Sequence, residues 1–166
     1  REPSARFRPM TSREAFWFRV RVPDVAIAHH RARPGGRLLS DAIFVGLLPT
    51  GAPDKVPPPP RVIVLFPFAP AGEGAAFLAD FDDRAPKLLD VIAGVQHFTE
   101  KTDDGWQCTA EIPWEALVGK KLPLGERLRF NFGVWDNDGR LFTELRTWAP
   151  YDDVSRWGTI VLEEAR

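Results

Sequence analysis

The sequence predicts an all-β fold, an antiparallel β-sandwich of about eight to ten strands with one short helix. In several segments apolar residues recur at every second position, which is the period of a strand with one buried face. The composition combines 6 Trp and 12 Phe with 16 Pro and 13 Gly, so aromatic strand formers are accompanied by many turn formers. The chain has 166 residues, which is enough to bury a core without metal ions or disulfides.

The first strand is expected within residues 14–23, where every second side chain is apolar. The inward face holds Phe16, Phe18, Val20 and Val22, and the outward face holds Trp17, Arg19 and Arg21. Strands at residues 38–48 and 61–68 follow, and the proline-rich stretch 47–60 is expected to be an extended loop, because it cannot join a strand ladder. Residues 1–12 are expected to form an N-terminal arm, and residues 13–166 a single domain.

The middle of the chain is expected to hold an edge strand at residues 75–81, a polar break at 82–86 and one strand through 88–99. An Asp-Gly turn within residues 101–105 then predicts a hairpin. The inward face of the strand after this turn holds Trp106, Cys108, Ala110 and Ile112. Pro113 ends that strand and suits the first turn of a short helix through residues 114–117.

Three more strands are expected in the last third of the chain, at residues 127–135, 143–148 and 157–163. In the first of them, alternation places four apolar side chains inward: Leu128, Phe130, Phe132 and Val134. The residues of the other parity are expected to face solvent: Arg129, Asn131, Gly133 and Trp135.

Composition and charge argue against several classes of function. Lys and Arg total 22 against 23 Asp and Glu, and the basic residues are scattered among acidic ones. The formal net charge of −1 therefore gives no reason to expect a nucleic-acid partner. No apolar run approaches the roughly 20 residues of a membrane span. Cys108 is the only cysteine, so neither an internal disulfide nor a Cys-based zinc site can form.

The sequence also predicts that the protein is not an enzyme. It contains no Gly-x-Ser-x-Gly elbow, no phosphate-binding loop and no dinucleotide fingerprint. Its one thiol, Cys108, lies on the inward face of its strand, where it would be unreactive.

The C-terminal half carries an ordered set of motifs. They are Asp104-Gly105-Trp106, Ile112-Pro113-Trp114, Gly125, the acidic turn at residues 136–138, Trp148 and Trp157-Gly158. Over residues 103–162 the chain resembles the carbohydrate-binding module family 9-like, DOMON-related β-sandwich domains. Glu111 directly precedes Ile112, closer than in the pattern of that family. The resemblance implies a non-catalytic module that binds a glycan, exported to the periplasm or the extracellular space and belonging to a larger multidomain protein.

Aromatic side chains are the natural partners of sugar rings, which present apolar C–H faces and a rim of hydroxyl groups. Packing roles are expected for four of the six Trp: Trp106, Trp114, Trp148 and Trp157. Trp17 and Trp135 remain, both on the outward parity of their strands. Together with the neighbouring polar residues Arg19 and Asn131, they are the predicted ligand-binding site.

The Asp136-Asn137-Asp138-Gly139 turn brings several oxygen ligands together, as calcium requires. We predict a structural calcium ion bound by Asp136 and Asp138. The same four residues also suit a simple hairpin turn, and the twelve-residue calcium loop is absent.

Two other functions stay open. The first is a structural or protein-interaction domain of a larger exported protein, with the proline run 57–60 as a docking surface. The second is a haem-binding DOMON-type module, for which Met10 and one of His29, His30 or His97 are the conceivable ligands.

Overall fold

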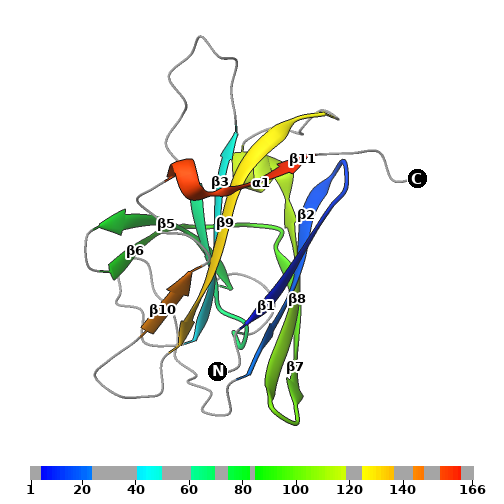
Figure 1. Cartoon of the computed structure of the whole chain (residues 1–166), viewed down its shortest axis with the longest axis vertical. Helices are drawn as coiled ribbons and strands as arrows, with labels where there is room; N and C mark the ends of the chain where they lie inside the picture. The colour runs from blue at the N-terminus through cyan, green and yellow to red at the C-terminus, as the bar shows by residue number, and fades with distance from the viewer. Residues whose placement is uncertain are drawn as a thin grey trace.

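The fold consists of two antiparallel sheets packed face to face (Figure 1). The computed structural model describes residues 5–23, 41–49, 61–69, 75–82, 85–118, 125–136, 144–147 and 154–161. The four-stranded sheet has, in spatial order, β1 (Arg6–Thr11), β2 (Ala15–Val22), β8 (Gly105–Pro113) and β7 (Gln96–Thr102). All its strand pairs are antiparallel.

The second sheet has seven strands. Its main path runs β10 (Glu144–Thr147), β9 (Arg127–Asp136), β3 (Ala42–Pro49), β4 (Arg61–Leu65), β5 (Ala76–Asp82) and β6 (Ala85–Val91), and β11 (Gly158–Val161) also pairs with β9. The helix α1 (Trp114–Val118) follows β8, and the 3-10 turn η1 (Val154–Arg156) precedes β11. The prediction of an all-β sandwich with one short α-helix is confirmed.

The main core lies between the two sheets. On β2 and β8 the predicted alternation is confirmed, because each inward residue of these strands is at most 6% exposed: Phe16, Phe18, Val20, Val22, Trp106, Cys108, Ala110 and Ile112. The inward residues of β3 belong to the same cluster, with Ile43, Val45 and Leu47 completely buried. Burial of such side chains, at roughly 1.5–3 kcal/mol each, is the main stabilising contribution to the sandwich.

Residues 6–11, which we expected within an N-terminal arm, form β1 and pair with β2 along their whole length. Phe7 anchors this strand to the rest of the sandwich. Its ring stacks on Phe18 with centroids 5.1 Å apart and on Phe132 with centroids 4.3 Å apart, so it contacts both sheets. The sequence pattern was misleading because Phe7 is the one large apolar residue of β1 that points inward.

Two predictions in the middle of the chain are wrong. Residues 88–99 are not one strand: β6 ends at Val91 in one sheet and β7 begins at Gln96 in the other. Gly94 has a φ of 76°, a left-handed conformation that favours glycine and allows the chain to turn between the sheets. The strand at residues 75–81 is not an edge strand, because β5 lies between β4 and β6.

The Ile-Pro-Trp motif ends β8 and begins α1, as predicted. The indole Nε1 of Trp114 donates a hydrogen bond of 2.8 Å to the carbonyl of Ser12, and its backbone N–H donates one of 3.0 Å to the carbonyl of Glu14. Both acceptors lie in the turn between β1 and β2. The motif therefore fastens the start of the helix to the first hairpin of the chain.

In the middle of the seven-stranded sheet, β3 and β4 are buried on both faces. On the face turned away from the main core, a second apolar cluster is formed by Ala42, Phe44, Val62, Val64, Phe66, Phe77, Ala79, Leu88 and Trp135. Three residues of β9 that we expected at the surface are buried, and the last of them belongs to this cluster: Asn131, Gly133 and Trp135. The helices within the described residues are too short to cross a membrane.

Candidate functional site

The four residues predicted to form one ligand site lie on opposite sides of the sandwich. Trp17 and Arg19 belong to β2 and point outward from the four-stranded sheet. Asn131 and Trp135 belong to β9 and point toward the outer side of the seven-stranded sheet, since Val134 of the other parity is in the main core. They cannot form one site with Trp17.

Trp135 and Asn131 are packing residues in this structure. The indole of Trp135 is 8% exposed and lies against Phe44, with ring centroids 5.9 Å apart. Asn131 is completely buried, and its Oδ1 accepts a hydrogen bond of 3.0 Å from the backbone N–H of Phe132. The prediction that both are exposed ligand residues is wrong, because alternation shows which face of the sheet a residue is on and not whether other residues cover that face.

The outer face of the four-stranded sheet, called the platform below, gathers the exposed polar and aromatic residues of four strands. The strand registers order it in three rows across β1, β2, β8 and β7: Met10, Trp17, Glu111 and Gln96; Arg8, Arg19, Thr109 and Phe98; Arg6, Arg21, Gln107 and Glu100. All of these residues are exposed or half-buried. The platform is therefore the candidate functional site.

Two aromatic side chains lie on the platform. Phe98 is 67% exposed, which is the highest value for a large hydrophobic residue in the described part of the chain, and Trp17 is half-buried. They are two strands and one row apart, which corresponds to about 12 Å for ordinary strand spacings. This distance is wider than one sugar ring, so only an extended ligand could contact both.

Phe98 was not among the predicted ligand residues, because only tryptophans were considered as sugar-binding aromatics. A signal was available in the sequence, because Phe98 has the same parity as the polar residues Gln96 and Glu100 and so had to face solvent with them. An apolar ring on an otherwise polar strand face is the feature that marks it.

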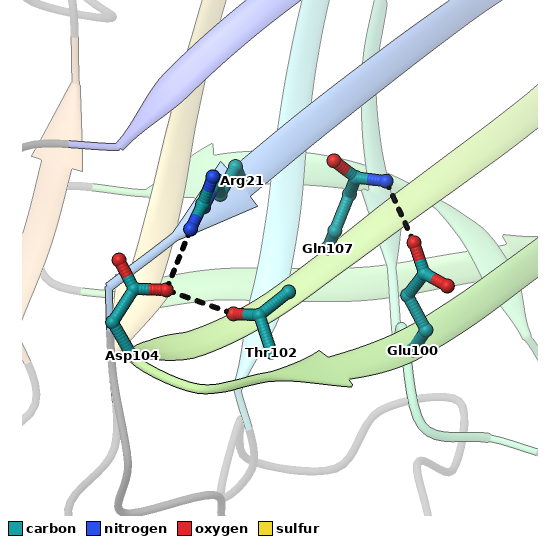
Figure 2. Close-up of polar contacts among 5 residues, drawn as sticks. All are labelled: Arg21, Glu100, Thr102, Asp104 and Gln107. Atoms are coloured by element: carbon teal, nitrogen blue, oxygen red, sulfur yellow. Dashed lines mark hydrogen bonds and ion pairs between the residues drawn. The ribbon is translucent and has the colours of Figure 1, made fainter.

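Polar contacts order one end of the platform (Figure 2). Arg21 Nη2 donates to Asp104 Oδ1 at 2.8 Å, and Thr102 Oγ1 donates to the same oxygen at 3.0 Å. The pKa of Asp104 is lowered, first by the hydrogen bond from Arg21 and then by the one from Thr102. The pKa of Arg21 is raised by its hydrogen bond to Asp104 and by the charge of that carboxylate. Gln107 Nε2 donates to Glu100 Oε1 at 2.9 Å across β8 and β7.

The predicted calcium ligands lie partly outside the described residues. Asp136 is the last residue of β9 and stands opposite Glu144, the first residue of β10, in the strand register. Asp138 lies outside the described residues. Within the ranges that the structure describes, no three His, Cys, Asp or Glu side chains are grouped as a metal site requires.

The described haem-ligand candidates are not brought together. Met10 and His97 lie on opposite faces of the four-stranded sheet, because Met10 pairs with Trp17 on the platform and His97 pairs with the buried Ala110. His29 and His30 lie outside the described residues, as does the proline run 57–60. Burial raises the pKa of Cys108 to about 11, in agreement with the prediction of an unreactive thiol.

Known proteins resemble this chain in structure. No protein-family model matches it, and no curated protein matches its sequence. A carbohydrate-binding module family 9 (CBM9) from Caldicellulosiruptor kristjanssonii, in complex with glucose, is similar over 98% of this chain and 78% of its own, with a TM-score of 0.64 and 16% identity. A CBM9 from the same organism in complex with cellotriose is similar over 98% of this chain and 76% of its own, with a TM-score of 0.58 and 17% identity.

A candidate carbohydrate-binding protein from Bacteroides uniformis is similar as well, over 96% of this chain and 78% of its own, with a TM-score of 0.57 and 13% identity. At identities this low, a structural likeness establishes the fold and no more. The DOMON relation implied by the sequence stays a prediction. The chain has the fold of the carbohydrate-binding module family 9-like β-sandwich domains.

Proposed function

We propose that the protein is a non-catalytic carbohydrate-binding module and that its glycan lies on the platform. The observation that carries this proposal is that the exposed Phe98 and the half-buried Trp17 lie on a sheet face whose other residues, apart from Met10, are polar. The likeness in fold to modules solved with glucose and with cellotriose supports it.

The chemistry of the platform suits a sugar chain. An aromatic ring can cover the apolar face of a pyranose, and each of the two rings is surrounded by groups that hydrogen-bond hydroxyls. Glu111 lies beside Trp17 and Thr109 lies beside Phe98, while Gln107 and Glu100 fill the next row. Because the two aromatics are about 12 Å apart, an oligosaccharide fits better than a monosaccharide.

Single variants test the site directly. Trp17→Ala and Phe98→Ala should each weaken the affinity for an oligosaccharide about fivefold, the loss expected for one aromatic stacking contact. Leu89→Ala is the matched control, because Leu89 is 40% exposed on β6 of the other sheet. Isothermal titration calorimetry against a panel of neutral and acidic oligosaccharides, cellotriose among them, gives the affinities.

Two results would count against the proposal. If the wild-type protein binds no glycan of the panel, the structural or protein-interaction role becomes the better reading. If glycans bind but Trp17→Ala and Phe98→Ala behave like Leu89→Ala, the ligand lies elsewhere on the molecule.

The cellular setting is part of the same proposal. We expect the domain to act outside the cytoplasm, in the periplasm or the extracellular space, as one part of a larger protein, because the resemblance to family 9-like carbohydrate-binding modules implies export. Fractionation of the source cells, with an antibody against this domain, tests the location and the length of the native chain together.

A further inference from the structure

Four arginines lie side by side at one edge of the platform. Arg6 and Arg8 point outward from β1, and Arg21 and Arg19 stand directly opposite them on β2. Neighbouring strands are about 5 Å apart, and residues two apart in a strand are about 7 Å apart. The four Cα atoms therefore mark the corners of a rectangle small enough for all four guanidinium groups to reach one ligand.

This arrangement does not serve folding. Like charges directly opposite each other on neighbouring strands destabilise a sheet, and here two such pairs are adjacent. Arg21 is compensated by Asp104 at 2.8 Å. Within the described residues Arg19 only donates Nε to Thr109 Oγ1 at 3.4 Å, and neither it nor Arg6 nor Arg8 makes an ion pair.

The opposite half of the platform carries the opposite charge. Glu100 is on β7, Glu111 is on β8, and Asp103 with Asp104 forms the turn that joins them. A uniformly charged polyanion such as double-stranded DNA would meet these carboxylates if it crossed the platform. A ligand with a few localised negative charges and many hydroxyl groups matches both halves.

We infer that the arginine cluster binds the carboxylates of an acidic polysaccharide, that is, a chain containing uronic acid residues. This inference rests on the proposed glycan-binding function and names its substrate class. The planar guanidinium group matches a carboxylate with two parallel hydrogen bonds. Trp17 directly precedes the cluster on β2, so a sugar ring stacked on its indole places a ring carboxylate beside Arg8 and Arg19.

The decisive comparison uses one polymer in two charge states. Polygalacturonate and its fully methyl-esterified form have the same backbone and differ in the carboxylate charge. Binding of each to the wild-type chain is measured by calorimetry at low and at physiological ionic strength. We expect the acid form to bind at least about tenfold more tightly than the ester, and added salt to reduce this difference.

Two double variants test whether the arginine cluster causes the difference in affinity between the acid and the ester. Arg8→Gln/Arg19→Gln should weaken binding of polygalacturonate about tenfold and leave binding of the methyl ester unchanged. Lys87→Gln/Arg156→Gln is the control, because it removes two exposed positive charges from the other sheet and its flanking turn. It should leave both affinities unchanged.

The other outcomes distinguish failure of the carboxylate inference from failure of the proposed function. Equal binding of acid and ester, or equal effects of the two double variants, overturns the carboxylate inference while glycan binding stands. Tighter binding of dextran sulfate or of DNA than of polygalacturonate shows a general polyanion site and also overturns it. If neither polymer nor any neutral oligosaccharide binds, the proposed function itself fails.

Discussion

Arg8 of β1 stands directly opposite Arg19 of β2 on the solvent-facing side of the four-stranded sheet. Replacing Arg8 by threonine removes the repulsion and adds a residue that favours strands, so Arg8→Thr should stabilise the fold by about 0.5 kcal/mol. Lys87→Thr is the matched control: it gains the same strand preference, but Lys87 stands opposite Asp80, a residue of opposite charge, so the change relieves no repulsion and should stabilise the fold less than Arg8→Thr does. Urea unfolding of both variants measures the effect, and equal or greater stabilisation by Lys87→Thr, or destabilisation by Arg8→Thr, would contradict it.

A side chain at position 46 should not fit, because Gly46 lies directly against the ring of Trp157. A Cβ built on Gly46 would lie 2.5 Å from the Cη2 atom of the Trp157 ring, which is itself buried. Gly46→Ala should therefore destabilise the protein by about 1–3 kcal/mol, the usual effect of overpacking a core. In a Trp157→Ala background the same change should have almost no effect, and a double-mutant cycle of unfolding free energies checks this coupling. Equal losses in both backgrounds would show that the indole is not the obstacle.

The two fully buried tryptophans Trp114 and Trp106 should respond differently to the same substitution. Trp114 Nε1 donates to the Ser12 carbonyl at 2.8 Å, whereas the indole nitrogen of Trp106 has no hydrogen-bond acceptor in the part of the chain that the structure describes. Trp114→Phe leaves a carbonyl without its donor and should lose about 1–2 kcal/mol more than Trp106→Phe. Chemical denaturation of the pair measures this difference, and equal losses would mean that volume alone decides the outcome.

How far the sequence could predict the fold depends on how many faces of a strand are buried. On β2 and β8 one face is in the core and the other is the platform, so polar and apolar residues alternate and the prediction was correct. On β9 the outward residues Asn131, Gly133 and Trp135 are buried as well, and Trp135 belongs to a second apolar cluster. Small and polar residues there still suggested a solvent-facing side, because a single strand carries no information about what packs on top of it.

The candidate site was predictable only in part, for a related reason. Trp17 and Arg19 were identified on the correct face. Their neighbours on the platform depend on strand order, since Arg19 contacts Thr109, which is 90 residues away in the chain. The same strand order turns scattered basic residues into a cluster, by setting Arg6 and Arg8 opposite Arg21 and Arg19. Registers between distant strands do not follow from local patterns.

Acid should remove the stabilising effect of the pair formed by Arg21 and Asp104. The folded protein lowers the pKa of Asp104 through the hydrogen bonds from Arg21 and Thr102. A carboxyl group with a lowered pKa stabilises the fold above its unfolded pKa, near 3.9, and loses this effect as the pH falls through the folded value. Asp104→Asn should therefore be less stable than wild type at pH 7, and the difference should shrink as the pH falls below about 4.

Asp90→Asn serves as the control for this pH series, because Asp90 is exposed on β6 of the other sheet. Unfolding midpoints in urea, measured for all three proteins across the acid range, give the comparison. High salt should also reduce the effect of Asp104→Asn, since the pair is exposed. A difference that stays constant from neutral to acid pH would show that the carboxylate charge is not involved.

Calcium should stabilise the end of the hairpin formed by β9 and β10. Asp136 stands opposite Glu144 there, and the predicted ligand Asp138 follows two residues after Asp136. Carboxylate oxygens are the ligands that calcium prefers. A ligand that binds only the folded state raises its stability, by about 2.7 kcal/mol at a hundred times the dissociation constant.

Thermal unfolding in excess calcium and in excess chelator tests this expectation. The wild-type protein should unfold at a higher temperature with calcium, and Asp136→Asn/Asp138→Asn should lose the difference between the two conditions. Magnesium should substitute poorly, because it demands a tighter octahedral geometry than calcium does. Asp103→Asn, in the turn before β8, is the control and should respond to calcium as the wild type does. Identical melting temperatures of the wild type in calcium and in chelator would refute a structural calcium ion.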